Sequence, residues 1–173
     1  MPRHIDYYFS LQSPWAYIGH RLFRDIAASH GAAVAVKPVM LLDLFAESGV
    51  RATFFTLGWI AERYPAMVRR IVAAGHELAS HGYGHLRASD QSRAEFDNDI
   101  RSSKALLEDI GGQQVIGYRA PSFSIGHGNL WALEALTEAG YRYSSSIYPI
   151  RHDHYGMPDA PRFAFYPNGP DGL

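Results

Sequence analysis

The sequence predicts one soluble α/β domain with a mostly parallel sheet of about six strands and alternating helices. Short β-branched and aromatic stretches alternate along the chain with amphipathic stretches that carry helix start and stop signals. The connections between them are short, which favours parallel strands covered by helices. The chain has 173 residues, 47% of them hydrophobic, which is enough for one buried core.

The first third of the chain predicts a strand, a helix, a second strand and a short helix. Residues 4–10 are rich in β-branched and aromatic side chains and predict the first strand. The helix after it begins at Ser13, which a proline follows, and ends at Gly31. Residues 32–41 predict the second strand, and residues 41–49 predict the short helix that closes this part of the chain.

The rest of the chain continues the same alternation. Four more strands are predicted, at residues 50–58, 76–81, 114–124 and 141–148. The helices between them are predicted at residues 61–75, 92–112 and 129–140. Pro65 should kink or restart the first of these helices, because proline lacks an amide hydrogen. In the second, Phe96, Ile100 and Leu107 fall on one stripe, which predicts the buried face.

The charge balance argues against nucleic acid and membranes as partners. The chain has 16 Lys+Arg and 17 Asp+Glu, so its net charge of −1 gives no broad basic field. It has no cysteine, which excludes disulfides and thiolate metal sites. No apolar run approaches the roughly 20 residues of a membrane span, and the first residues lack the apolar core of a signal peptide. We therefore expect a cytoplasmic protein.

Two histidines four residues apart, His81 and His85, follow the strand predicted at residues 76–81. Ligands of parallel α/β folds lie at the carboxyl ends of strands, and one turn of chain could aim both imidazoles at one cation. Gly82 and Gly84 favour a loop rather than a helical turn. Two exposed or hydrogen-bonded histidines without a metal are the alternative interpretation.

Arg119 ends the next predicted strand, in the sequence YRAPSFS, so its guanidinium is expected at the same mouth as the two histidines. A surface or salt-bridged arginine is the alternative. His152 and His154 alternate around Asp153 and could bind a metal, but the surrounding turn residues favour a solvated loop.

Several aromatic residues could form a sugar-binding platform, although their strand and helix spacing favours a place in the core. These residues are Trp15, Tyr17, Phe54, Phe55 and Trp59.

Six phrases of residues 42–173 carry a resemblance to a known family. They are GVRATFF, AAGHELASHGYGH, RSSKALLEDIGG, GYRAPSFSI, EAGYRYSSSIYP and HDHYGMPDAPRF. In this order and spacing they resemble the polysaccharide deacetylases of carbohydrate esterase family four, close to the branch associated with exopolysaccharide export. The resemblance implies a distorted (β/α) barrel that removes N-acetyl groups from polysaccharides or oligosaccharides with a divalent metal, Zn²⁺ above all. It implies His81 and His85 as two of three metal ligands, Arg119 as the residue that orients the catalytic base, and the Phe123 backbone N–H as an oxyanion-hole donor.

The resemblance breaks where that family places its carboxylates. The family has paired aspartates at the end of its first barrel strand, whereas no strand before Leu42 ends in such a pair. Asp43 or Asp6 is then the candidate third ligand. Ser144 stands where this branch commonly has aspartate, and the chain reaches Leu173 without the late acid histidine of the family. We therefore expect weak Zn²⁺ binding and little or no deacetylase activity.

The first 48 residues resemble a different family. The stretches IDYYFSLQSPWAYIGHRLF and VKPVMLLDLFAESG are similar to the thioredoxin-like 2-hydroxychromene-2-carboxylate isomerases and kappa-class glutathione transferases. That resemblance implies that Ser13 lies against the sulfur of glutathione, while a simple helix cap at Ser13 is the alternative.

The two resemblances together predict a chimera of residues 1–45 and 46–173 that folds as one continuous unit. Unpaired edges of its partial barrel would invite homo-oligomers. A recombined chain with no activity is the remaining hypothesis.

Overall fold

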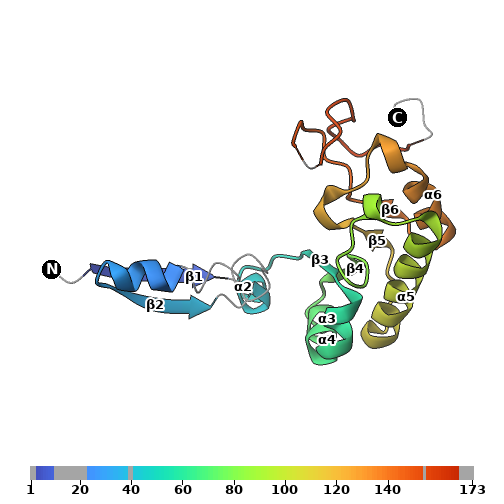
Figure 1. The fold of residues 1–173 in the computed structure, drawn as a ribbon. Coiled ribbons are helices and arrows are strands. Elements are labelled where there is room, and N and C mark those ends of the chain that lie inside the picture. Colours follow the sequence, from blue (N-terminus) through green and yellow to red (C-terminus); the bar gives the residue numbers. More distant parts are fainter. Residues whose placement is uncertain (1–2, 10–22, 39–40, 154, 168–173) are drawn as a thin grey trace. The chain divides into compact units, whose positions relative to one another are not determined.

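The computed structural model describes residues 3–9, 23–38, 41–153 and 155–167, and divides the chain into two compact units, Met1–Val50 and Arg51–Leu173. In the N-terminal unit, strand β1 (Arg3–Phe9) pairs in parallel with strand β2 (Ala32–Pro38) over its whole length. Residues 23–29 between them are helical, and helix α2 (Leu41–Glu47) follows. The predicted strand–helix–strand–helix order of this unit is confirmed in its described residues (Figure 1).

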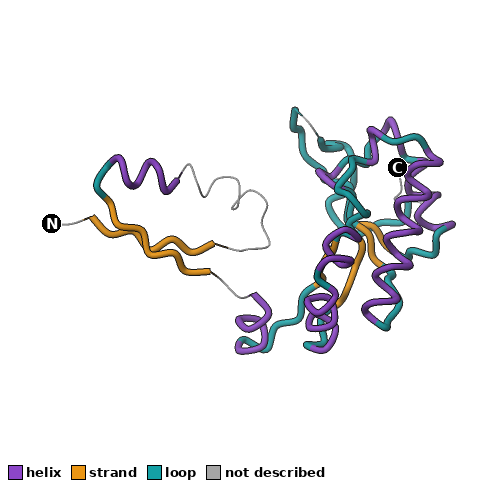
Figure 2. Tube along the Cα trace, turned by 60° about the horizontal axis from the view of Figure 1, so that its bottom comes forward, coloured by secondary structure: helices purple, strands orange, loops and turns teal. Residues whose placement is uncertain are grey.

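The C-terminal unit is built on a four-stranded parallel sheet in the order β3-β4-β5-β6. Its strands are β3 (Thr53–Thr56), β4 (Glu77–Ser80), β5 (Gly117–Tyr118) and β6 (Tyr143–Ser144). Within the described residues, β1 and β2 pair in the N-terminal unit and β3 to β6 pair in the C-terminal unit (strands orange in Figure 2). One continuous sheet of about six strands stays a prediction. Both sheets are parallel, as the alternation of strands and helices predicts.

Four α-helices connect the strands of the C-terminal unit. They are α3 (Gly58–Arg63), α4 (Pro65–Ala73), α5 (Arg93–Gly111) and α6 (Trp131–Glu138). Pro65 separates α3 from α4 and opens α4, so the predicted restart is confirmed. The described residues of the unit also form short 3₁₀ turns at Ala88–Asp90, Pro121–Phe123 and His127–Asn129.

Helix α5 is the central helix of this unit. Ser92 and Glu95 form a capping box at its start, and Gly112 ends it in the left-handed conformation with φ 65°. Its buried face packs against β4 and against α3, α4 and α6 (Figure 1). The predicted stripe of Phe96, Ile100 and Leu107 is fully buried, which confirms the amphipathic pattern.

The hydrophobic core of the C-terminal unit lies between α5, α6 and the sheet. Phe96 makes edge-to-face contacts with Tyr118 of β5 and Trp131 of α6, at ring-centroid distances of 5.9 and 5.6 Å. Leu78 and Val115 are also fully buried here. This packing fixes the positions of β4 and β5, and with them the residues that follow these strands.

A side-chain bridge joins the amino ends of three strands. Glu77 at the start of β4 accepts hydrogen bonds from the Thr53 hydroxyl of β3 at 2.6 Å and from the Tyr143 hydroxyl of β6 at 2.7 Å. Tyr143 reaches Glu77 by passing over Gly117 of β5, where any Cβ atom would overlap the phenol. Glycine in β5 is therefore what allows the bridge to span the sheet.

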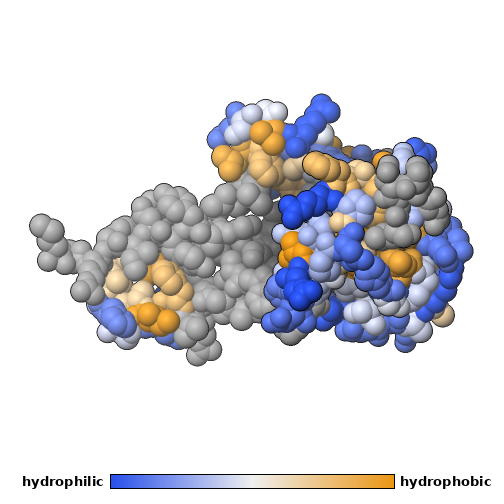
Figure 3. All heavy atoms as spheres, turned by 90° about the horizontal axis from the view of Figure 1, so that it is seen from above, coloured by the Kyte–Doolittle hydropathy of each residue, from blue (hydrophilic) through white to orange (hydrophobic). Residues whose placement is uncertain are grey.

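The surface of the C-terminal unit mixes apolar and polar areas. Hydrophobic patches lie between hydrophilic ones on the face shown in Figure 3, and Phe163 and Tyr166 are more than four-fifths exposed. None of the helices in the described ranges combines the length and apolar character that a membrane crossing requires.

Candidate functional site

The carboxyl ends of the four strands bring the sequence-predicted residues to one edge of the sheet. The backbone ladder continues past the strands: His81 N–H donates to Thr56 O, Arg119 N–H to Ser80 O, and Ser145 N–H to Tyr118 O. Successive strands therefore place His81, Arg119 and Ser145 side by side. This edge is opposite the bridge at Glu77, because all four strands are parallel.

His81 and His85 lie close together beside Arg119. The ring centroids of the two histidines are 5.1 Å apart, with an interplanar angle of 78°. The Nδ1–H of His81 donates a hydrogen bond to the backbone carbonyl of Arg119 at 2.6 Å. This bond fixes the tautomer of His81 and leaves Nε2 as the ring nitrogen with a lone pair, the arrangement that metal-binding histidines use.

Burial is the main influence on the charge of His81. It lowers the pKa of His81 below 6.5, and the neighbouring His85 and Arg119 lower it further, while the hydrogen bond to the Arg119 carbonyl raises it. Burial therefore favours the neutral form of His81, which is the form that binds a metal. His85 is exposed and adopts a left-handed conformation with φ 61°.

Helix α5 holds the loop that carries the two histidines, through its residue Asp99. Gly82 has φ 75°, and its N–H donates to the Ser80 hydroxyl at 3.2 Å. The Tyr83 N–H donates to the Asp99 carboxylate at 3.1 Å. A Cβ on Gly82 would stand only 2.7 Å from Asp99 Oδ2. Burial raises the pKa of Asp99, and the hydrogen bond from Tyr83 opposes that rise.

The Arg119 guanidinium lies across the ends of the strands. It donates to the Ser145 hydroxyl at 2.7 Å and through Nε to the Ser145 carbonyl at 3.2 Å. Its Cζ lies 4.2 Å from the Phe55 ring centroid and 5.7 Å from that of Phe123. Burial lowers its pKa. No carboxylate is paired with Arg119 in the part of the chain that the structure describes.

Phe123 lies in the short turn after β5. Ser122 and Phe123 both have positive φ angles, 55° and 50°, which side-chain-bearing residues rarely adopt. The Phe123 N–H donates to the Ala120 carbonyl at 3.2 Å. A role as an oxyanion-hole donor would require this hydrogen bond to open, and that role stays a prediction.

The remaining sequence candidates lie elsewhere. Ser13, Trp15, Tyr17, His154 and the side chain of Asp6 are outside the described residues, so the glutathione role of Ser13 stays a prediction. Asp43 is exposed in the first turn of α2, within the N-terminal unit.

The expected core position of Trp59 is wrong, because the ring lies on the outer side of α3. It is 41% exposed, and the Arg63 guanidinium lies 4.7 Å from its centroid.

Two polar groups near the site, the carboxylate of Asp99 and the hydroxyl of Ser145, are absent from the sequence-based candidates. Asp99 carries a usable signal, because it falls beside Ile100 and between Phe96 and Ser103 on the buried stripe of α5. A charged residue on such a stripe requires a polar partner. Ser145 follows β6 at the same edge as His81, so the strand-end rule applied to the last strand points to it.

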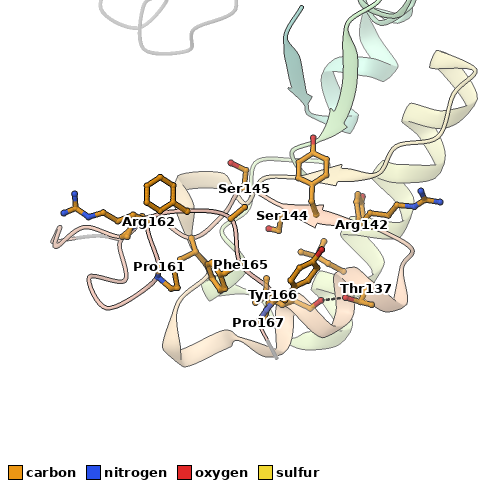
Figure 4. A pocket seen from close by; sticks show the side chains of 17 residues that line it. Thr137, Arg142, Ser144, Ser145, Pro161, Arg162, Phe165, Tyr166 and Pro167 are labelled. Atoms are coloured by element: carbon orange, nitrogen blue, oxygen red, sulfur yellow. Dashed lines mark hydrogen bonds between the residues drawn. The ribbon is translucent and has the colours of Figure 1, made fainter. Parts of the chain in front are cut away.

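A cavity of about 720 Å³ lies next to this edge, between α6, β6 and residues 161–167 (Figure 4). His81, His85 and Arg119 do not line it. Ser145 lines it and also binds the Arg119 guanidinium, so the cavity and the strand-end site meet at this residue.

Comparison with known proteins gives a consistent family assignment for the region that carries the site. A family model described as polysaccharide deacetylase matches residues 37–144. A peptidoglycan-N-acetylglucosamine deacetylase of Bacillus cereus is 32% identical over 102 residues. The match covers 59% of this chain and 46% of the relative, so the chain spans less than half of that protein.

Solved structures give the same fold. A polysaccharide deacetylase from Mycobacterium smegmatis, described as putative in its name, is 25% identical with a TM-score of 0.59, over 84% of this chain and 51% of that chain. A pseudoenzyme of carbohydrate esterase family four from Bacillus anthracis is 16% identical with a TM-score of 0.57, over 82% and 42%. At 16% identity, the second match supports the fold alone.

Proposed function

Because the chain belongs to the polysaccharide deacetylase family, we propose that its C-terminal unit is a deacetylase-like scaffold that binds N-acetylated polysaccharide and hydrolyses it poorly or not at all. Curated relatives named as deacetylases of peptidoglycan, chitin and chitooligosaccharides support the substrate class. The observation that carries the proposal is the pair His81 and His85 beside Arg119, with no acidic side chain placed to complete it in the described part of the chain.

The divalent metal that the family implies fits this site only in part. The neutral His81, held through Nδ1, and the adjacent His85 make a suitable pair of imidazole donors. A protein site for catalytic Zn²⁺ ordinarily has three protein ligands. Across the described ranges, no group of three His, Cys, Asp or Glu side chains is placed to hold a metal. We therefore expect weak metal binding and derive no catalytic step through a metal.

The second requirement is a general base, and no carboxylate is paired with Arg119 among the residues that the structure describes. Removal of an acetyl group by water requires a side chain that accepts the proton of that water within hydrogen-bond reach. The guanidinium of Arg119, which would orient such a base, is bound to Ser145 instead. Asp99 is committed to the Tyr83 amide behind the loop. What the site retains is a cationic and aromatic surface suited to binding rather than to hydrolysis.

Two measurements on the full chain test this proposal. Calorimetric titration with Zn²⁺ should give weak binding that both His81→Ala and His85→Ala abolish, while the exposed His127→Ala leaves it unchanged. Acetate release from an N-acetylglucosamine oligomer should stay at the background level. Turnover comparable to that of an active relative, lost in His81→Ala, would contradict the impaired site.

A further inference from the structure

The guanidinium of Arg119 has one occupied edge and one free edge. Its Nε and Nη2 atoms form the side-on edge, and both donate to Ser145, at 3.2 Å to the backbone carbonyl and at 2.7 Å to the hydroxyl. The end-on edge, formed by Nη1 and Nη2, carries two further parallel N–H groups. Among the described residues, no oxygen accepts a hydrogen bond from this end-on edge. We call it the free edge of Arg119.

Arg119 is held in place from several sides. Its backbone N–H donates to the Ser80 carbonyl at 3.0 Å, and its own carbonyl accepts the hydrogen bond from His81. Ser145 holds the side-on edge of the guanidinium. A group that is positioned before a ligand arrives loses little freedom on binding, which favours affinity.

The surroundings of Arg119 strengthen the effect of its charge. The residue is half-buried, and its Cζ atom lies 4.2 Å from the ring centroid of Phe55 and 5.7 Å from that of Phe123. These rings displace water from the guanidinium but offer it no oxygen acceptor. A charge in partly dry surroundings attracts an opposite charge more strongly than a charge in bulk water does.

No negative charge in the described ranges offsets that of Arg119. Burial lowers its pKa, Tyr143 opposes this change, and no described carboxylate contributes to it. The carboxylate of Asp99 accepts the Tyr83 amide behind the histidine loop instead. Because a guanidinium keeps its charge at neutral pH, this half-buried cation favours an anionic ligand.

The shape of the free edge selects among anions. The two oxygens of a carboxylate can accept the two parallel N–H groups together, in the bidentate arrangement that arginine and carboxylates form. A halide ion has no second oxygen to match the second N–H group. A phosphate dianion would give up the hydration of two charges for the attraction of one cation, which makes its transfer into a half-buried site more costly.

We infer that the free edge of Arg119 is a binding site for a small monocarboxylate anion. The site needs neither a metal nor hydrolysis, because the charge of Arg119 and its two bonds to Ser145 are enough to form it. The inference therefore goes beyond the proposed function and does not rest on it.

Titration of the full chain with sodium formate tests the site, with EDTA present and the ionic strength held constant with sodium chloride. The backbone amide signals of Phe123 and Ser145, followed by nuclear magnetic resonance, should shift to saturation with a dissociation constant on the order of 1–10 mM. Arg119→Lys keeps the charge but loses the fork, so it should bind formate at least about tenfold more weakly. Arg69→Lys, which changes an exposed arginine of α4, should bind like wild type.

A second measurement uses only the wild-type protein, so it does not depend on the folding of Arg119→Lys. Phenylglyoxal reacts with the Nη atoms of arginine, and mass spectrometry of peptides gives the rate at each residue. Formate at twice its dissociation constant should slow the reaction of Arg119 about threefold by mass action. The reaction of the exposed Arg69 should not change, and chloride at the same concentration should not protect Arg119.

Several outcomes would overturn the site. These are amide shifts that do not saturate in folded wild-type protein, full affinity in Arg119→Lys, and equal protection of Arg119 by chloride. Tighter binding of inorganic phosphate than of formate would overturn the ligand class.

The formate assays contain no free metal and measure no acetate, so their result is separate from that of the zinc and turnover tests. Formate binding by a chain that also hydrolyses N-acetylglucosamine oligomers would support the carboxylate site and contradict the proposed function. A blank formate titration of a chain that binds zinc weakly and releases no acetate would do the reverse.

Discussion

The imidazole of His81 donates a 2.6 Å hydrogen bond to the backbone carbonyl of Arg119, so the residue after β4 is tied directly to the residue after β5. This bond requires a proton on Nδ1 but no positive charge on the ring. Burial, with His85 and Arg119 nearby, opposes that charge and lowers the pKa of His81.

The lowered pKa predicts a pH dependence of stability. The unfolded chain takes up a proton on His81 near pH 6.5, whereas the folded chain does so only at lower pH. The unfolded state therefore binds more protons in this window, and the free energy of unfolding should fall as the pH drops from about 7.5 to about 5. Chemical denaturation should show a weaker fall in His81→Gln, and an unchanged fall in the exposed His30→Gln. The same pH dependence of unfolding free energy in wild type, His81→Gln and His30→Gln would show that His81 is not its cause.

Gly82 and Gly84 give a matched pair in one loop. Gly82→Ala places a Cβ at φ 75° and 2.7 Å from Asp99 Oδ2, so it should lower the free energy of unfolding by at least about 1 kcal/mol. A Cβ on Gly84 meets no atom within 4 Å, so Gly84→Ala should change the free energy of unfolding by less than about 0.5 kcal/mol. Urea denaturation of the two variants measures the difference. Similar losses in both would mean that Asp99 does not constrain the loop.

Asp99→Asn should stabilise the protein at neutral pH. Because burial raises the pKa of Asp99, the folded state holds a proton that the unfolded state loses above pH 3.8, so stability falls as the pH rises through that window. Asparagine removes this cost and still offers an oxygen to the Tyr83 amide. Thermal denaturation should show a gain at about pH 7 that shrinks at about pH 4.

Asp99→Ala is the control, since it loses the hydrogen bond from Tyr83 at a cost of about 1 kcal/mol. A less stable Asp99→Asn at neutral pH would show that the loop needs the carboxylate charge.

The core of the C-terminal unit should be sensitive at Phe96. Its ring is fully buried between Tyr118 and Trp131, so Phe96→Ala should lower the free energy of unfolding by about 3–5 kcal/mol. The exposed Tyr64→Ala should stay within about 0.5 kcal/mol of wild type. Urea denaturation followed by near-ultraviolet circular dichroism measures both. A loss below about 1 kcal/mol in Phe96→Ala would contradict the packing of α5.

Much of the fold could be predicted from the sequence, because local patterns reflect local physics. The stripe on α5, the restart at Pro65 and the helix end at Gly112 follow from side-chain periodicity, a missing amide hydrogen and a positive φ angle. Which strands share a sheet could not be predicted. Alternation of strands and helices is the same whether the strands join one sheet or two, so the sequence pattern alone does not decide it.

The positions of the site residues could be predicted where these residues directly follow a strand. His81, His85 and Arg119 each follow a strand, and parallel strands bring such residues to one edge. The partners of these residues are contacts between distant segments. Ser145 binds Arg119 across 26 positions of sequence, and Tyr148 and Tyr155 meet Phe123 from a later loop. Turn-rich composition at residues 149–156 predicts a loop but not the stacking of its rings.

The Thr53–Glu77–Tyr143 bridge lies at the amino ends of the strands, and the residues with chemical potential lie at the other ends. The residues of this bridge are thus different from those that could act on a substrate. Substitution of an exposed residue at the histidine end, such as His85, leaves this bridge in place. Such a separation lets a protein lose an ancestral reaction and still persist in the cell as a folded module, open to recruitment for a different task.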